Sequence, residues 1–178
     1  MTCDYSDEKD INRRDWDALV AVNANTEGND GNNVKEFLAR ERDLYQIELR
    51  ELPDVSSLSL LHLQCHFSLD TLALAPKGAT VTGCDYSSAK IEKAWWPATK
   101  LGFNATFIEG DLYDAPDLIS GQFDAVFVRW GAINWLLHIQ GWAKVMTHFV
   151  KLGGWFYMKK DIPWPTRPIM KTPTARCA

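Results

Sequence analysis

The sequence predicts a doubly wound α/β domain, in which a mostly parallel sheet has helices on both faces. Three observations lead to this fold class: short apolar runs alternate with helical patterns, the alternation continues through residues 58–160, and turn-forming residues bound each apolar run. Strands that alternate with helices form right-handed crossover connections, which bury both faces of the sheet.

Five segments have the composition of buried strands, because each is a short apolar run between turn-forming residues. The strands are predicted at residues 58–64, 79–85, 105–111, 123–130 and 154–160. Between them, apolar residues at helical spacing predict helices over residues 69–75, 87–101 and 140–151. Pro97 is expected to kink or end the second of these helices, because proline lacks an amide hydrogen.

The α/β core, predicted over residues 58–160, is flanked by two zones of different composition. Residues 1–57 are polar and end in a helical stretch, and we interpret them as an N-terminal helical segment that covers the binding pocket. Trp16 and Tyr45 are the aromatic side chains expected to close over that pocket. The four prolines of residues 161–178 predict an extended tail, since proline cannot donate to a sheet ladder.

The composition is that of a globular protein: of the 178 residues, 46% are hydrophobic and 24% are charged. The net charge of −4 argues against a nucleic-acid-binding face of clustered lysine and arginine. No apolar run reaches the roughly 18 residues that span a bilayer, and the acidic N-terminus lacks the apolar core of a signal peptide. The four cysteines are scattered without metal-binding spacing. We therefore expect no metal site, no membrane association, and reduced thiols in a cytoplasmic protein.

The candidate site residues follow the predicted strands, because ligands of an open parallel sheet bind beyond the carboxyl ends of its strands. Asp85 ends the second strand, where its carboxylate can accept hydrogen bonds from both hydroxyls of a ribose. Asp111 ends the third strand, where it can accept the exocyclic amine of adenine, and Gly110 before it leaves room for a ring. The other candidates that follow strands are Gln64, Cys65, His66, Ser68, Tyr86, Leu112 and Arg129.

Simpler roles compete for several of these residues. Asp85 can cap the helix that follows it, and Asp111 can be a turn residue. His62 alternates with apolar residues inside a strand, which is typical of a core histidine. Cys65 more simply lines the pocket than acts as a nucleophile. We therefore assign no catalytic residue.

Glycine-rich phosphate loops are absent from the sequence. Neither G-x-G-x-x-G nor G-x-x-x-x-G-K-[ST] occurs, although dinucleotides and nucleoside triphosphates need such loops for backbone contact with phosphate. Two acids at the ends of adjacent strands, without such a loop, favour an uncharged adenosine over NAD, FAD or ATP.

Motifs in a fixed order resemble the class I S-adenosylmethionine-dependent methyltransferases. The run LLHLQCHFSLDTLAL at residues 60–74 resembles the first motif of a subfamily whose usual form is LHLQCHFG-x-DT. The later motifs are matched by ATVTGCDYS, FDAVFVRWGAINWL and KLGGWFYM, and the family's N-terminal stretch by INRRDWD and ELRELPDV. The resemblance implies a Rossmann-like methyltransferase core that binds S-adenosylmethionine. It places the methionine end of the cofactor over residues 64–68, the ribose on Asp85, and the adenine near Asp111 and Leu112.

The sequence also departs from this family. The resemblance places glycines where Gln64, His66 and Ser68 stand, and the subfamily normally keeps the last glycine, so the Cβ of Ser68 is expected to crowd the cofactor. Arg129 replaces a small polar residue beside the methyl donor. The chain stops where the family continues with a helix and a two-stranded hairpin. The fifth strand is therefore expected to be an exposed edge through which two copies can pair.

Methyl transfer from S-adenosylmethionine to a small-molecule acceptor is the function that these observations favour. The alternative is a catalytically inactive binding or scaffold module, which the departures at Ser68 and Arg129 and the missing hairpin favour. A nicotinamide oxidoreductase would share the fold, but the missing glycines argue against it. The intact Asp85, Asp111 and motif order favour retained cofactor binding.

Overall fold

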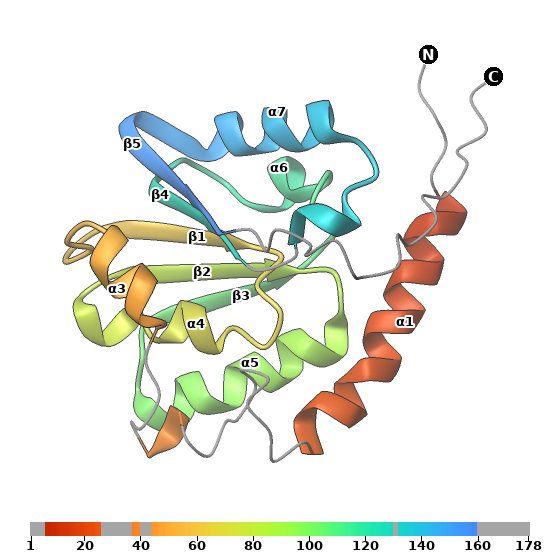
Figure 1. Cartoon of the computed structure of the whole chain (residues 1–178), viewed down its shortest axis with the longest axis horizontal. Coiled ribbons are helices and arrows are strands. Elements are labelled where there is room, and N and C mark those ends of the chain that lie inside the picture. Colours follow the sequence, from red (N-terminus) through yellow and green to blue (C-terminus); the bar gives the residue numbers. More distant parts are fainter. Residues whose placement is uncertain (1–5, 26–36, 40–43, 130–131, 160–178) are drawn as a thin grey trace.

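Five parallel strands form one sheet in the order β3-β2-β1-β4-β5 (Figure 1). The computed structural model describes residues 6–25, 37–39, 44–129 and 132–159. The strand order reverses between β1 and β4, which confirms the predicted doubly wound fold. The strands are β1 Ser59–Leu63, β2 Thr80–Asp85, β3 Ala105–Glu109, β4 Phe123–Val128 and β5 Val150–Met158.

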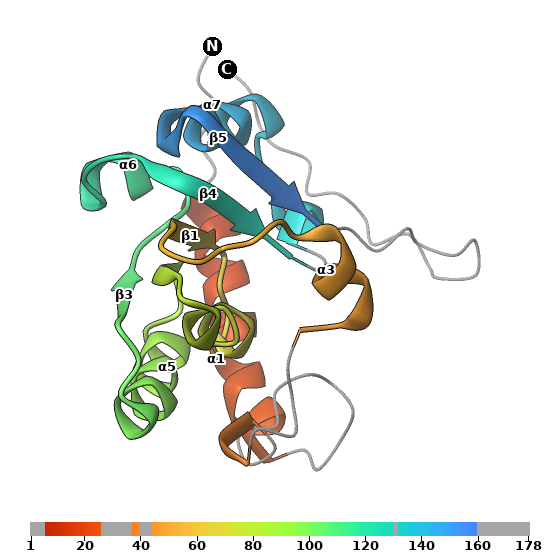
Figure 2. The same ribbon diagram turned by 90° about the vertical axis from the view of Figure 1, so that its left-hand side faces the viewer.

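Helices cover both faces of the sheet, and one further helix stands across the carboxyl ends of the strands (Figures 1 and 2). One face carries α3 (Gln46–Glu51), α4 (Leu69–Leu72) and α5 (Ser88–Leu101), with the 3₁₀ turn Ala75–Lys77. The other carries α6 (Ala115–Leu118) and α7 (Ile139–Phe149), with the 3₁₀ turn Ala132–Trp135. The helix at the strand ends is α1 (Ser6–Asn25). No helix in the described ranges has the length and apolar character needed to cross a membrane.

The central strand β1 shows how the two cores form. Successive side chains of a strand point to opposite faces. Leu60 therefore packs in the core under α3, α4 and α5, whereas Leu61 and Leu63 pack in the core under α6 and α7. All three are fully buried, as expected for a strand of a parallel sheet with two covered faces.

The observed strand bounds lie within two residues of the predicted ones, except for the start of β5, which comes four residues earlier. The third strand ends at Glu109, so Asp111 lies in the loop beyond it. The fifth strand begins at Val150, directly after α7, and its register shifts before Trp155 pairs with Ala125. Within the described residues β5 lies at one edge of the sheet. The predicted tail, residues 161–178, lies outside the described residues.

The expectation that Pro97 ends its helix was wrong, because α5 continues through it to Leu101. Pro97 is buried together with Ala94 and Ala98, so it contributes to the apolar face that packs against the sheet. The helix ends instead at Gly102, whose φ of 65° lies in the left-handed region where glycine is favoured.

His62 is a core histidine, as its alternation with apolar residues predicted. It is 2% exposed, its Nδ1 lies 2.6 Å from the Thr71 hydroxyl, and its ring packs edge-on against Phe127. Burial lowers the pKa of His62 to about 3, with smaller contributions from the charges of Arg129 and His66. The imidazole is therefore neutral at physiological pH.

Acidification should destabilise the fold through His62. Below an unfolded-state pKa of about 6.5, the unfolded chain binds a proton that the native chain does not, so stability falls as pH falls toward 3 by about 1.4 kcal/mol per pH unit. Chemical denaturation between pH 7.5 and 4.5 measures this slope. We expect a shallower slope in His62→Gln and an unchanged slope in His148→Gln, whose imidazole is exposed. Equal slopes in wild type and His62→Gln would contradict this assignment.

Candidate functional site

The loop after β1 follows the backbone path of a glycine-rich loop without containing glycine. Gln64, His66 and Ser68 have φ values of 58°, 54° and 58°, in the left-handed region that costs a non-glycine residue about 1–3 kcal/mol. These are the three positions at which the family resemblance places glycine. The loop keeps this conformation because its backbone amides donate hydrogen bonds. Cys65 N–H donates to the Cys84 carbonyl (3.0 Å), and Ser68 N–H donates to the Cys65 carbonyl (2.9 Å).

Asp85 joins this loop to the next strand and helix. Its Oδ2 accepts from the His66 N–H (2.9 Å), and its Oδ1 accepts from the Ser87 N–H (3.1 Å). The residue is 5% exposed. The helix cap that Asp85 was an alternative candidate for is supplied by Ser87, whose side chain accepts a hydrogen bond from the Lys90 N–H at the start of α5. Each carboxylate oxygen has lone pairs enough for a further donor, so this geometry is compatible with a ribose contact.

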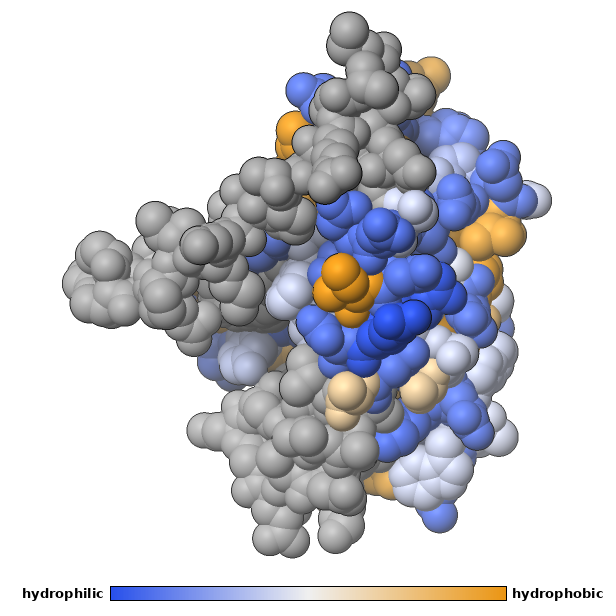
Figure 3. Space-filling model, turned by 90° about the vertical axis from the view of Figure 1, so that its right-hand side faces the viewer, coloured by the Kyte–Doolittle hydropathy of each residue, from blue (hydrophilic) through white to orange (hydrophobic). Residues whose placement is uncertain are grey.

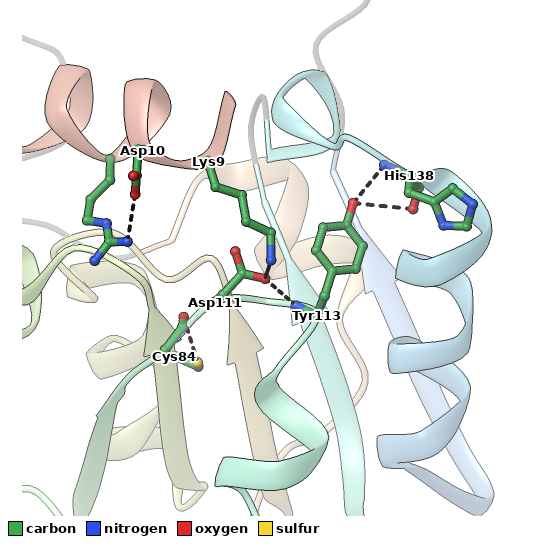
Figure 4. Close-up of polar contacts among 8 residues, drawn as sticks. Lys9, Asp10, Cys84, Asp111, Tyr113 and His138 are labelled. Atoms are coloured by element: carbon green, nitrogen blue, oxygen red, sulfur yellow. Dashed lines mark hydrogen bonds and ion pairs between the residues drawn. The ribbon is translucent and has the colours of Figure 1, made fainter. Parts of the chain in front are cut away.

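Asp111 lies in the loop after β3, where α1 reaches it (Figure 4). Its Oδ1 accepts from the Tyr113 N–H (2.8 Å) and lies 3.2 Å from the Lys9 ammonium. The Tyr113 hydroxyl in turn donates to the His138 carbonyl (3.2 Å) and accepts from the His138 N–H (2.9 Å). Asp111 is thus both a turn residue and a partly exposed acceptor. Leu112 beside it is 8% exposed and packs in the core under α6 and α7.

The space beside Gly110 is used in the packing of α6. A Cβ at this position would clash with the Leu118 side chain. The glycine therefore makes room for Leu118, and the interpretation that it also leaves room for a ligand ring stays a prediction.

The remaining loop candidates differ in what their side chains offer. Gln64 donates through Nε2 to the Ala132 carbonyl (3.2 Å), while its buried Oε1 accepts no hydrogen bond from the described residues. Burial raises the pKa of the Cys65 thiol well above its usual range, which keeps it protonated and argues against a nucleophilic role. Tyr86 is half-buried, and its pKa is raised mainly by that burial, with contributions from nearby Asp85 and other acids.

Arg129 lies in a buried group of ions. Its Nε and Nη2 donate to the two oxygens of Glu48 at 2.6 and 2.8 Å, and Nη1 pairs with Asp70. Glu48 is fully buried. The group links α3 and α4 to the end of β4. Tyr45 packs near the guanidinium, 5.3 Å from ring centre to Cζ.

Helix α1 contacts the segments after four of the strands. Trp16 packs edge-on against His66 after β1 and Trp135 after β4, with centroid distances of 5.6 and 5.1 Å. Asp17 accepts a hydrogen bond from the Ser87 hydroxyl after β2. Lys9 pairs with Asp111 after β3. These contacts place Trp16 at the carboxyl edge of the sheet, and its predicted role of closing over a ligand pocket stays a prediction.

Lys90 is a site residue that the sequence interpretation missed. It is 2% exposed, and its ammonium lies 3.9 Å from the centre of the Trp16 ring. Burial lowers the pKa of Lys90, while Asp85, Cys65 and Asp17 act to raise it. Its place near the start of a helix gave no signal of this burial, because a lysine there ordinarily faces solvent.

Within the described residues, no group of three or more His, Cys, Asp or Glu side chains is arranged to hold a metal ion. The side chains gathered at the carboxyl edge are instead carboxylates, one amide, two ammonium groups and aromatic rings. Such a set can bind an organic ligand through hydroxyl and amine groups.

A family model described as a methyltransferase domain matches residues 60–154, which is more than half of the chain. The chain belongs to this methyltransferase family. The match extends from β1 into β5 and therefore includes every strand-end segment described above.

Solved structures share the fold of this methyltransferase domain. The phosphoethanolamine N-methyltransferase 1 of Haemonchus contortus, solved with phosphoethanolamine and S-adenosylhomocysteine, is 15% identical over 99% of this chain and 38% of its own, with a TM-score of 0.69. The magnesium protoporphyrin IX methyltransferase of Synechocystis, solved with S-adenosylhomocysteine, is 16% identical over 80% of this chain and 68% of its own, with a TM-score of 0.58.

A third structure comes from work on the conversion of a disulfide bond into a thioacetal group during echinomycin biosynthesis. It is 25% identical over 58% of this chain and 45% of its own, with a TM-score of 0.53. The chain thus spans less than half the length of this third protein and of the Haemonchus enzyme. No curated protein sequence matches the chain.

Relief of the left-handed strain should stabilise the methyltransferase domain. Ser68→Gly is expected to raise the free energy of unfolding by about 1 kcal/mol, because glycine adopts the φ of 58° without a Cβ penalty. Urea denaturation measures the change. Ser68→Ala is the matched control, since it also removes the hydroxyl but keeps the Cβ. Equal effects of the two substitutions would show that the hydroxyl, and not the backbone conformation, decides the stability at this position.

Proposed function

We propose that this methyltransferase domain binds S-adenosylmethionine at the carboxyl edge of its sheet and transfers the methyl group to a small-molecule acceptor. The observation that carries the proposal is the loop after β1, which is left-handed at Gln64, His66 and Ser68 and is bonded to the carboxylate of Asp85. The two enzymes of similar fold that hold S-adenosylhomocysteine support the same cofactor.

The residues at this edge fit such a cofactor. The buried Oε1 of Gln64 has no donor among the described residues, and the ammonium group of a methionine moiety would supply one. In the proposed arrangement Gln64, Cys65, His66 and Ser68 lie under the methionine end. Asp85 accepts the ribose hydroxyls with Tyr86 beside it, and Asp111 and Leu112 flank the adenine.

Arg129 enters the proposal in another way. Its guanidinium is held by Glu48 and Asp70, so we propose that it positions α3 and α4 rather than touching the cofactor. Breaking a buried ion pair by removing one partner is strongly destabilising. A change at Arg129 would therefore act on the site through the fold.

S-adenosylmethionine supplies a methyl group on a sulfonium, which is already a good leaving group. The chain's contribution is then to orient the reactants and exclude water. A general base is needed only where the acceptor loses a proton, and none is assigned. His62 is unsuited to that task because it is buried in the core under α4.

Two further predictions belong to this proposal. Pairing of two copies through β5 is compatible with the partial exposure of Phe156 and Met158, 39% and 40%, on this edge strand. A cytoplasmic location is compatible with the free thiols of Cys65 and Cys84.

Calorimetric titration with S-adenosylmethionine and S-adenosylhomocysteine tests the cofactor. We expect saturable binding that weakens by about tenfold or more in Asp85→Ala, a loss of about 1.4 kcal/mol or more. Glu109→Ala is the matched control, because Glu109 is an exposed carboxylate at the end of β3. Circular dichroism verifies that each variant is folded. A folded wild type that binds neither compound up to millimolar concentration would leave the scaffold alternative, and binding of NADH would favour the oxidoreductase.

A further inference from the structure

We propose that α1 occupies the cofactor site in this conformation and must leave it before S-adenosylmethionine binds, so that the helix inhibits the domain's own site. This inference rests on the proposed function. It differs from the covering role expected of the N-terminal segment, because a cover closes over the bound cofactor whereas α1 here competes with it.

The aromatic contacts of Trp16 lie where the methionine end of the cofactor is proposed to bind. The indole packs against His66 on one side and Trp135 on another, and the Lys90 ammonium lies 3.9 Å from its ring centre. These partners come from the segments after β1, β4 and β2. The methionine end of the cofactor is proposed to lie over the loop that contains His66. Groups already in contact leave no room between them, so Trp16 fills space that the cofactor would need.

The polar contacts of α1 involve the segments proposed to bind the adenine and the ribose. The Lys9 ammonium lies 3.2 Å from Oδ1 of Asp111, the carboxylate proposed to accept the exocyclic amine of adenine. It also lies 5.5 Å from the centre of the Tyr113 ring. Lys9 therefore offers Asp111 the kind of donor that adenine would offer. Asp17 similarly binds the Ser87 hydroxyl, next to the proposed ribose site.

The way in which α1 packs against the domain allows the helix to be displaced. Among the side chains of residues 6–18, none is fully buried, and Ile11 is 56% exposed. Figure 3 shows this side of the molecule, where the coloured surface is mostly hydrophilic with isolated hydrophobic spots. Docking also buries the Lys90 ammonium, which forms no ion pair with another described residue. The described side chains of residues 6–18 thus make few buried apolar contacts, and segments held by few such contacts open at low cost.

Release of α1 is tested with Lys9→Ala, Trp16→Ala and the double variant in the full chain. If the docked state outweighs the open state by about tenfold, removing its contacts tightens the apparent Kd for S-adenosylhomocysteine by about the same factor. Arg14→Ala is the matched control, because it removes one positive charge from an exposed position of the same helix and should leave the Kd unchanged. Calorimetry gives the Kd, and hydrogen–deuterium exchange of residues 6–25 reports whether the helix leaves.

Three outcomes separate this inference from the proposed function. Tighter binding by the variants, together with faster exchange of residues 6–25 when S-adenosylhomocysteine is added to wild type, supports both. Binding by wild type that weakens or stays equal in the variants, with slower exchange of α1, overturns the inference and leaves the proposed function standing. Absence of binding by wild type and all variants overturns both.

Discussion

The carboxylate of Asp85 organises the carboxyl edge of the sheet. It ends β2, accepts the His66 N–H from the loop after β1, and accepts the Ser87 N–H at the start of α5. A carboxylate buried to 5% exposure needs such donors, because burying a charge without hydrogen bonds is costly. Hydrogen bonds to an ionised acceptor are also stronger than neutral ones. One side chain therefore sets the position of three segments.

This constraint explains how the domain keeps a glycine-type loop without glycine. Gln64, His66 and Ser68 hold unfavourable φ values, and such conformations persist only where the surroundings over-determine them. Asp85 supplies one restraint, and the hydrogen bonds donated by the Cys65 and Ser68 amides supply two more. Ser68 adopts the left-handed backbone conformation despite its Cβ, and the crowding of the cofactor by that Cβ stays a prediction. Local strain and a buried carboxylate thus produce the geometry that the proposed cofactor needs.

Much of the sheet could be predicted from the sequence because parallel strands buried on both faces are short apolar runs. The acids Asp85 and Asp111 could be found because they follow such runs. The ion pairs of Arg129 with Glu48 could not, since the partners lie 81 positions apart and no local pattern connects them. A helical N-terminal segment was predicted, but the bounds of α1 were not, because its sequence is polar. The burial of Lys90 depends on the packing of Trp16 over it, which is a tertiary contact without a local signal.

The central claim is that the loop after β1 and the carboxylate of Asp85 form the cofactor site, and backbone NMR during titration with S-adenosylhomocysteine tests it most directly. The account predicts that the largest amide shift changes occur at residues 64–68, 86–87 and 111–112, the segments that Asp85 and Asp111 organise. Changes confined to other parts of the domain, with these amides unmoved, would show that the ligand binds elsewhere and would contradict the account.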